Sequence, residues 1–181
     1  AIIGNVQQAS VIFLALNPGF KCTDIDDQKV KGFKDHIQLS LCQDPKATFY
    51  FLDEKFQNTN GYKWWAPRLS SLTSEFRPDL LAKKIACVQY FPYHSTKYLR
   101  RRNHLPSQGY SFDLVKRAVK DVKNKKIIVI MRSIQLWHDA PCELSKHPEK
   151  VLTLRNPRCA YVSEGNTKLG DLEKIKKALR R

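Results

Sequence analysis

The stretch VIFLALNPGF, residues Val11–Phe20, predicts a buried β-strand that ends in a tight turn. The first six residues are all apolar and leave no polar face, which is typical of a strand covered on both sides in a parallel sheet. Asn17 then lies at the carboxyl end of the strand, the edge where open parallel sheets bind ligands. Pro18 and Gly19 impose a tight backbone that can approach a ligand closely, although the same residue types also form purely structural turns.

The rest of the chain alternates between strand and helix patterns. Three further apolar runs predict strands, at Ile85–Tyr90, Ile127–Met131 and Val151–Leu154. Helical patterns cover Val30–Cys42, Tyr62–Phe76, Phe112–Lys123 and Leu169–Leu179. This alternation predicts one α/β domain over residues 1–181, a three-layer α/β/α arrangement around a central four-stranded, mostly parallel sheet.

Two local features refine this prediction. Ser111 is the expected N-cap of the third helix, and Val122 is expected to belong to the apolar stripe of that helix. The aromatic segment Thr48–Phe56 fits either an edge strand or part of an extended loop, and the sequence leaves these alternatives open.

The chain is strongly basic. It carries 32 Lys and Arg against 17 Asp and Glu, a net charge of +15. Because such an excess favours a polyanion, nucleic acid is the expected partner. No apolar run is long enough to cross a bilayer.

The cysteines indicate no metal centre. The five cysteines are widely scattered, with neither a Cys-x-x-Cys pair nor a short Cys/His cluster. We expect reduced thiols, with Cys87 in the core of a strand, in a cytoplasmic monomer without metal or cofactor. Nothing in the sequence has the pattern of a signal or transit peptide.

The residues that follow the four predicted strands are polar or aromatic. They are Asn17-Pro18-Gly19-Phe20, Phe91-Pro92-Tyr93-His94-Ser95, Arg132-Ser133 and Asn156-Pro157-Arg158. Since parallel strands end at one edge of a sheet, we expect these segments to line one cleft. Such a cleft can hold a planar polar base beside a phosphate backbone.

Two of these segments resemble motifs of the uracil-DNA glycosylase superfamily. Leu16-Asn17-Pro18-Gly19 is similar to the first motif of its mismatch-specific uracil or thymine branch, and Asn156-Pro157-Arg158 occupies the place of its second motif. The order of elements matches over most of the chain. The chain departs from many members in having Asn17 in place of an aspartate and Asn156 in place of a histidine. The resemblance therefore implies a glycosylase fold with an altered base preference.

Base excision requires few residues, and the expected roles follow from their chemistry. Asn17 is expected to position water, and His94 to exchange a proton with the departing base or the water. The expected base pocket consists of Pro18, Gly19, Phe20, Tyr90, Tyr93, Ser95 and Asn156. The expected DNA contacts are Lys97, Arg100, Arg101, Arg102, Arg132 and Arg158.

Each assignment has a structural alternative. Phe20 also fits core packing, His94 a structural hydrogen bond, and the basic run after His94 a solvated loop. The predicted function is a monofunctional DNA glycosylase acting on uracil or a modified pyrimidine, in repair or in defence against phage with modified DNA. A non-catalytic nucleic-acid-binding module on the same fold is the main alternative. A nucleotide hydrolase fits less well, because the sequence has no acidic cluster for Mg²⁺.

Overall fold

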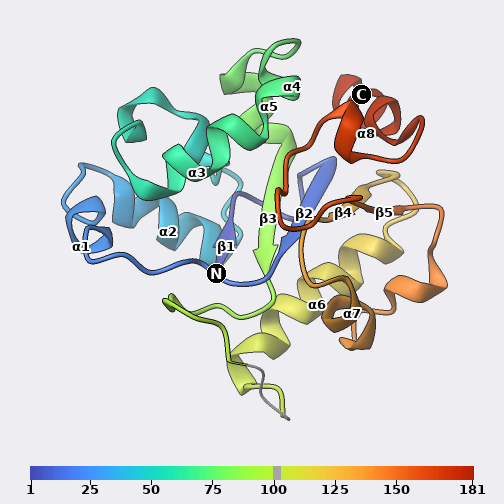
Figure 1. Ribbon diagram of the computed structural model, residues 1–181, viewed down its shortest axis with the longest axis horizontal. Helices are drawn as coiled ribbons and strands as arrows, with labels where there is room; N and C mark the ends of the chain where they lie inside the picture. The colour runs from blue at the N-terminus through green and yellow to red at the C-terminus, as the bar shows by residue number, and fades with distance from the viewer. Residues whose placement is uncertain (100–102) are drawn as a thin grey trace.

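A computed structural model describes residues 1–99 and 103–181 of the chain (Figure 1). The described residues form one five-stranded sheet in the order β1-β3-β2-β4-β5. The strands are β1 (Ile2–Ile3), β2 (Val11–Ala15), β3 (Ile85–Gln89), β4 (Ile127–Ile130) and β5 (Val151–Thr153). Strands β2 to β5 pair in parallel, so the predicted mostly parallel α/β sheet is confirmed.

The prediction of four strands was wrong, because β1 adds a fifth. This strand has only two residues and pairs antiparallel with β3, with Ile2 opposite Val88 and Ile3 opposite Cys87. A pair of apolar residues is too short to show a period of two in the sequence, so no strand pattern was visible. The four predicted strands are present, and each ends one residue earlier than expected.

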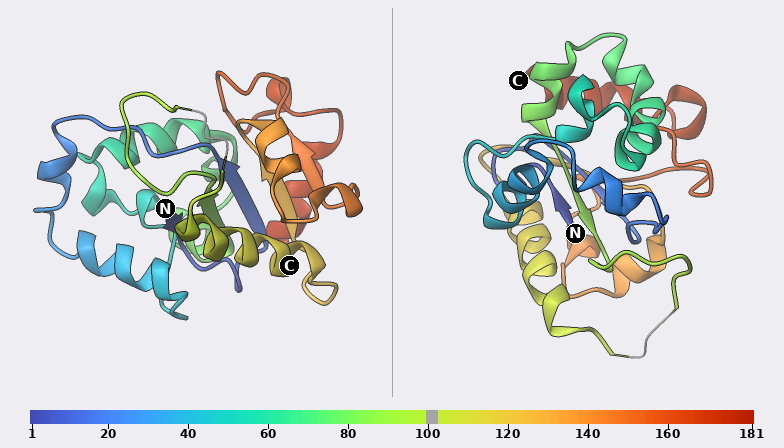
Figure 2. Two further views of the ribbon diagram at one scale, coloured as in Figure 1. Left: turned by 90° about the horizontal axis from the view of Figure 1, so that it is seen from below. Right: turned by 90° about the vertical axis from the view of Figure 1, so that its left-hand side faces the viewer.

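Helices cover both faces of the sheet. They are α1 (Asp24–Asp27), α2 (Phe33–Cys42), α3 (Asn60–Arg68), α4 (Ser70–Thr73), α5 (Pro78–Lys84), α6 (Pro106–Lys120), α7 (Ile134–Asp139) and α8 (Asp171–Arg180). Single 3₁₀ turns lie at η1 (Tyr50–Leu52), η2 (Glu54–Phe56), η3 (Leu144–Lys146) and η4 (Glu164–Asn166). Figure 1 shows α3 and α8 above the sheet and α6 and α7 below it, and Figure 2 shows the same arrangement from two other sides.

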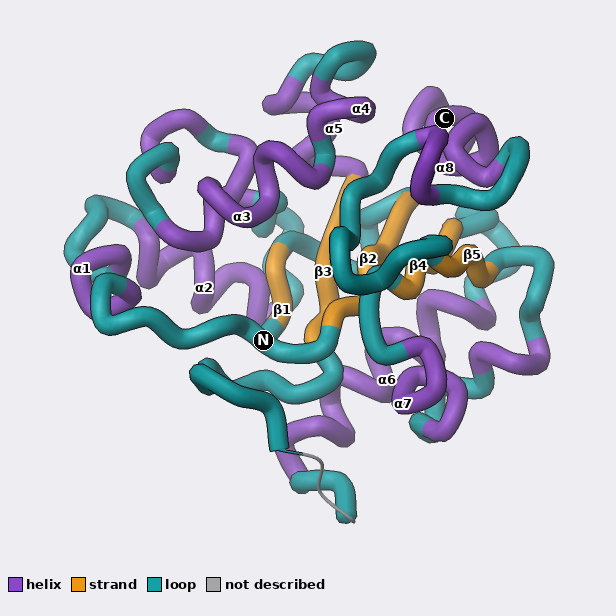
Figure 3. Tube along the Cα trace, in the orientation of Figure 1, coloured by secondary structure: helices purple, strands orange, loops and turns teal. Residues whose placement is uncertain are grey.

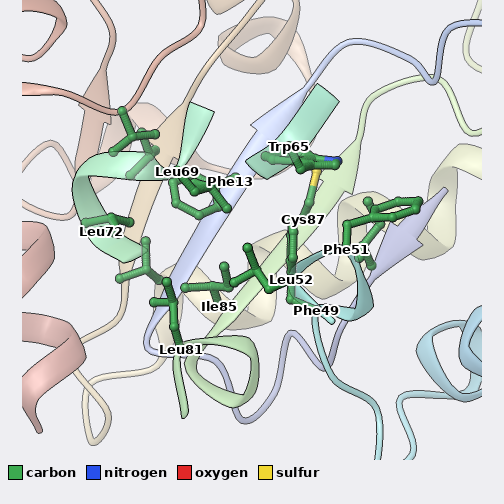
Figure 4. Packing of buried hydrophobic residues seen from close by; sticks show 14 of the residues in the cluster. Phe13, Phe49, Phe51, Leu52, Trp65, Leu69, Leu72, Leu81, Ile85 and Cys87 are labelled. Carbon is green, nitrogen blue, oxygen red and sulfur yellow. The ribbon is translucent and has the colours of Figure 1, made fainter. Parts of the chain in front are cut away.

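Successive side chains of β2 point to opposite faces of the sheet and so contribute to two separate cores. Phe13 points into a core shared with α3, α5 and α8, whereas Ile12 and Leu14 point into a core shared with α6 and α7. In the first core the ring of Trp65 packs edge-on against Phe49, with centroids 4.9 Å apart, and also contacts Phe13 (Figure 4). Burying this strand on both sides accounts for its lack of polar residues.

Several helix limits differ from the predictions. Helix α6 begins at Pro106 with Leu105 as N-cap, so Ser111 lies inside the helix and is not its cap. The side chain of Gln108 caps this helix start by accepting a hydrogen bond from the N–H of Leu105. The prediction placed the cap at Ser111 and so missed this role of Gln108. Val122 lies beyond the end of α6 and is exposed, so its assignment to the apolar stripe was wrong.

Two other predicted helices are shorter or divided. Helix α2 begins at Phe33 because Gly32 before it adopts a positive φ of 81°. The predicted helix over Tyr62–Phe76 is split at Leu69 into α3 and α4, two residues after Pro67, which has no backbone N–H to donate. The segment Thr48–Phe56, for which two alternatives were open, contains two 3₁₀ turns and no strand.

No helix among the described residues is long and apolar enough to cross a membrane. The cysteines all lie within the described residues, and none of them forms a disulfide. Cys87 is buried in the core as predicted, and burial raises the pKa of its thiol to about 12. Such a thiol stays protonated at neutral pH and is a poor nucleophile.

Candidate functional site

A pocket of about 1020 Å³ opens at the carboxyl ends of β2 and β3, between these strands and helices α1, α2 and α3. Its walls include the turn Asn17–Phe20, the segment Tyr93–Ser95 and Arg132. The ends of three predicted strands therefore meet at one pocket. The fourth segment, Asn156–Arg158, does not line it.

The turn after β2 and the loop after β3 are held together by hydrogen bonds. The N–H of Phe20 donates to the carbonyl of Ser95 over 3.1 Å, and the N–H of Ser95 donates to the carbonyl of Pro18 over 3.2 Å. Gly19 and Ser95 form an isolated parallel bridge, so the pairing of the two strands continues into their loops. Figure 3 shows these two loops running side by side. The catalytic candidates are consequently carried on a common backbone frame.

Asn17 is oriented by two hydrogen bonds from its amide nitrogen. Nδ2 donates to Oγ of Ser95 over 2.9 Å and to the carbonyl of Pro18 over 3.0 Å. These bonds determine which end of the amide is engaged, and within the described residues Oδ1 accepts no side-chain or backbone hydrogen bond. Asn17 can therefore offer an acceptor oxygen to a water molecule or a sugar hydroxyl in the pocket.

His94 is oriented by the same frame. Its Nδ1 lies 2.8 Å from the carbonyl oxygen of Gly19 and 3.3 Å from Oδ2 of Asp24. Since both neighbours are acceptors, we assign the proton of the neutral ring to Nδ1, which leaves Nε2 as the proton acceptor. Asp24 was not predicted from the sequence. It helps to orient the imidazole of His94, and it accepts hydrogen bonds in turn from the N–H of Lys21 and the side-chain amide of Asn60.

Aromatic side chains provide flat surfaces at the pocket. Phe20 and Tyr93 are 40% and 51% exposed, so neither belongs to the core, and both line the pocket. The core alternative for Phe20 is thereby removed. Trp64 of α3 is among the further aromatic residues that line the pocket, and its place there was not predicted from the sequence. Exposed rings in the wall of a pocket that also carries polar groups are suited to stacking on a base.

Gln89 and Tyr90, at the end of β3, point to opposite sides of the sheet. Gln89 lines the pocket, is only 7% exposed, and has a buried Oε1 for which no described residue provides a hydrogen bond. Tyr90, predicted as a pocket wall, lies on the opposite face of the strand and packs against Phe112 and Trp137. Its hydroxyl lies 2.9 Å from Nε2 of His104. Because strand side chains alternate, Gln89 rather than Tyr90 faces the pocket.

Of the predicted DNA-contact residues that the structure describes, Arg132 lines the pocket, whereas Lys97 and Arg158 lie outside it. Arg132, at the end of β4, lines the pocket, and its guanidinium donates to the backbone carbonyl of Arg158 over 3.2 Å. Arg158 and Asn156 are exposed outside the pocket, where Oδ1 of Asn156 accepts the N–H of Arg158. Lys97 is exposed next to the loop after β3 and does not line the pocket. The predicted contacts Arg100, Arg101 and Arg102 lie outside the described residues.

Carboxylates at the pocket are few. Asp27 lines it, accepts the N–H of Asn60 over 3.0 Å, and has a pKa that burial raises above its usual value. In residues 1–99 and 103–181, no three His, Cys, Asp or Glu side chains gather in a way that could hold a metal ion. The site thus offers amides, an imidazole, guanidinium groups and aromatic rings as its binding chemistry.

Comparisons of the chain with models of known protein families, with curated proteins and with solved structures found no match. The chemistry of the pocket is therefore the basis for assigning a function.

Proposed function

We propose that this protein is a monofunctional DNA glycosylase with a three-layer fold like that of the uracil-DNA glycosylases. Its substrate is a uracil-like or modified pyrimidine base in DNA. The observation that carries the proposal is the pairing of Asn17 and His94 on one hydrogen-bonded frame, in a pocket that is also lined by Gln89, whose buried Oε1 has no hydrogen-bond partner among the described residues. The net charge of +15 supports a polyanionic partner for this pocket.

In the proposed reaction the target nucleotide is extruded from the DNA and its base enters the pocket. Phe20 and Tyr93 stack on the base, and Oε1 of Gln89 accepts a hydrogen bond from an N–H at the edge of the base. Such an N–H is present on uracil and thymine and absent from the corresponding ring position of cytosine. A buried acceptor without a partner discriminates strongly, because a base that cannot donate leaves it unsatisfied.

Hydrolysis then replaces the N-glycosidic bond with a bond from C1′ to the oxygen of water. The electron pair of the broken bond leaves with the base, and the water loses a proton as it adds to C1′. Oδ1 of Asn17 orients this water, and Nε2 of His94 accepts its proton and returns it to the departing base. Asp24 and the carbonyl of Gly19 stabilise the imidazolium that forms transiently.

The experiment is single-turnover excision, with enzyme in excess, on oligonucleotides that carry uracil, thymine mismatches or modified pyrimidines. On the base that the parent excises, we expect Asn17→Ala and His94→Ala each to lower the rate about 100-fold or more, the usual effect of losing one positioned polar group. DNA affinity should change much less. Asn58→Ala is the matched control, because Asn58 is exposed in a turn outside the pocket.

Two outcomes contradict the proposal. A parent that binds DNA but forms no abasic site on any base supports the non-catalytic binding module. A folded Asn17→Ala variant that excises at the parent rate removes Asn17 from the reaction, and a thermal melt verifies that the variant is folded.

A further inference from the structure

Two arginines at the pocket have no carboxylate partner among the residues that the structure describes. Arg68 of α3 and Arg132 after β4 both line the pocket and both contact the ring of Trp64, with their guanidinium carbons 4.1 Å and 5.6 Å from its centroid. No Asp or Glu of the described chain lies within 4.0 Å of either one. The acidic residues that neutralise other cations, such as Glu75 and Glu143, serve lysines and Arg180 elsewhere.

The hydrogen bonding of these guanidinium groups is incomplete as well. Arg68 donates through Nη1 to the carbonyl of Trp64 over 2.6 Å, and Arg132 donates through Nη2 to the carbonyl of Arg158 over 3.2 Å. The Nε atoms of both residues are buried, and neither finds an acceptor in the described part of the chain. Buried donors of this kind are rare in proteins and indicate a missing acceptor.

Electrostatics favour the same conclusion. Burial lowers the pKa of Arg68, and the positive charge of Arg132 lowers it further, whereas the side chains of Tyr161 and Cys159 act in the opposite direction. Two like charges held against one indole, without a counterion, repel each other in the free protein. An anion between them removes this repulsion and supplies acceptors for the unused N–H groups.

We propose that Arg68 and Arg132, supported by Trp64, form a phosphate-binding site in the wall of the pocket. Planar guanidinium groups match the oxygen pairs of a phosphate. That this phosphate belongs to DNA rests on the proposed function, since a nucleotide whose base lies in the pocket carries a phosphodiester at the edge of the pocket. A phosphate group on a free nucleotide or in solution has the same chemistry, and the test separates these sources.

The first measurement uses inorganic phosphate as the probe. We expect phosphate to bind the full chain and to raise its melting temperature relative to chloride at equal ionic strength. Arg68→Gln and Arg132→Gln should each weaken phosphate binding by about tenfold to a hundredfold, as expected for charge-assisted hydrogen bonds. Arg117→Gln is the matched control, because Arg117 is an exposed arginine of α6 away from this pocket.

Stability distinguishes a binding role from a structural role. If the two arginines serve an anion, either glutamine variant should melt in chloride at the same temperature as the parent or higher, because the repulsion is relieved. A clear fall in melting temperature, with phosphate binding unchanged, overturns the proposal and makes the pair a packing element around Trp64.

The second measurement uses uracil-containing oligonucleotides with one neutral methylphosphonate placed in turn at each linkage around the target base. If the site holds a DNA phosphate, a methylphosphonate at one linkage should weaken binding of the oligonucleotide to the parent by about tenfold. The same methylphosphonate should have little further effect on binding to the Arg68→Gln/Arg132→Gln variant. If no position matters but inorganic phosphate binds, the site takes a free phosphate group. Phosphate binding by a protein that excises no base refutes the glycosylase assignment and leaves this site intact.

Discussion

Gln89 is a single polar residue that lies buried at the end of an otherwise apolar strand. It is the last residue of β3 and is only 7% exposed, yet its Oε1 is unsatisfied among the described residues. Leaving a buried polar atom without a partner costs about 1–3 kcal/mol. Proteins keep such groups where a ligand completes the hydrogen bond.

Replacing this amide with an apolar group of similar shape should separate stability from function. We expect Gln89→Leu to fold with a free energy of unfolding equal to the parent or up to about 1 kcal/mol higher, because it removes the unsatisfied oxygen. Excision should fall by about tenfold to a hundredfold. Urea unfolding and single-turnover excision measure the two effects. A variant that is less stable but equally active would place Gln89 in the core as a structural residue.

Helix α3 illustrates the scale of one element. It carries Trp64, Trp65 and Arg68, and its second residue, Gly61, lies directly against the ring of Phe51 in η1. A Cβ built on Gly61 lies 2.0 Å from Cζ of Phe51, which is far inside van der Waals contact. The missing side chain thus allows the start of α3 to approach η1, and this approach places Trp64 and Arg68 at the pocket.

A pair of glycine substitutions tests this packing. Gly61→Ala should lower the free energy of unfolding by about 1–3 kcal/mol, because the Phe51 ring must move in a well-packed core. Gly109→Ala in α6 is the matched control, since nothing lies within 4 Å of its Cβ position. There the change should stabilise the helix by about 0.5–1 kcal/mol. Chemical denaturation of both variants measures the difference, and equal effects would show that the ring yields without cost.

At the scale of the whole molecule, a net charge of +15 makes the folded chain repel itself. A few carboxylates offset this repulsion by pairing with several cations each. Glu143 pairs with Lys116 and Lys120 of α6 and with Lys146 of η3, which ties the two elements together. Hydrogen bonds from these lysines lower the pKa of Glu143 to about 2.

This pKa predicts how stability depends on pH. A carboxyl with a lowered pKa in the folded state stabilises the fold above its unfolded value of 4.5, and this contribution is lost as pH falls toward about 2. We expect Glu143→Gln to lower the melting temperature at pH 7 and to flatten its fall between pH 4.5 and 2. The control is Glu164→Gln, an exposed residue for which no ion pair forms with any described residue. Equal slopes in Glu143→Gln and the parent would contradict this prediction.

The α/β class and the succession of parallel strands along the chain were predictable from local sequence patterns. The apolar runs at Val11–Ala15 and Ile127–Ile130 are buried on both faces, and burial of this kind leaves a signal within a few adjacent residues. The turn Asn17–Phe20 and the loop with His94 were predicted as one site on the same basis, because parallel strands end at one edge.

The remaining residues of the pocket are brought together by the packing of helices on the sheet. Asp24, Gln89 and Arg68 reach the pocket from α1, β3 and α3, and no local spacing relates them. The strand pattern could not say whether Gln89 or Tyr90 faces the pocket, because both faces of β3 are buried and a shift of one residue exchanges them. Periodicity reports which residues are buried, whereas the contacts between distant segments depend on how the helices pack on the sheet.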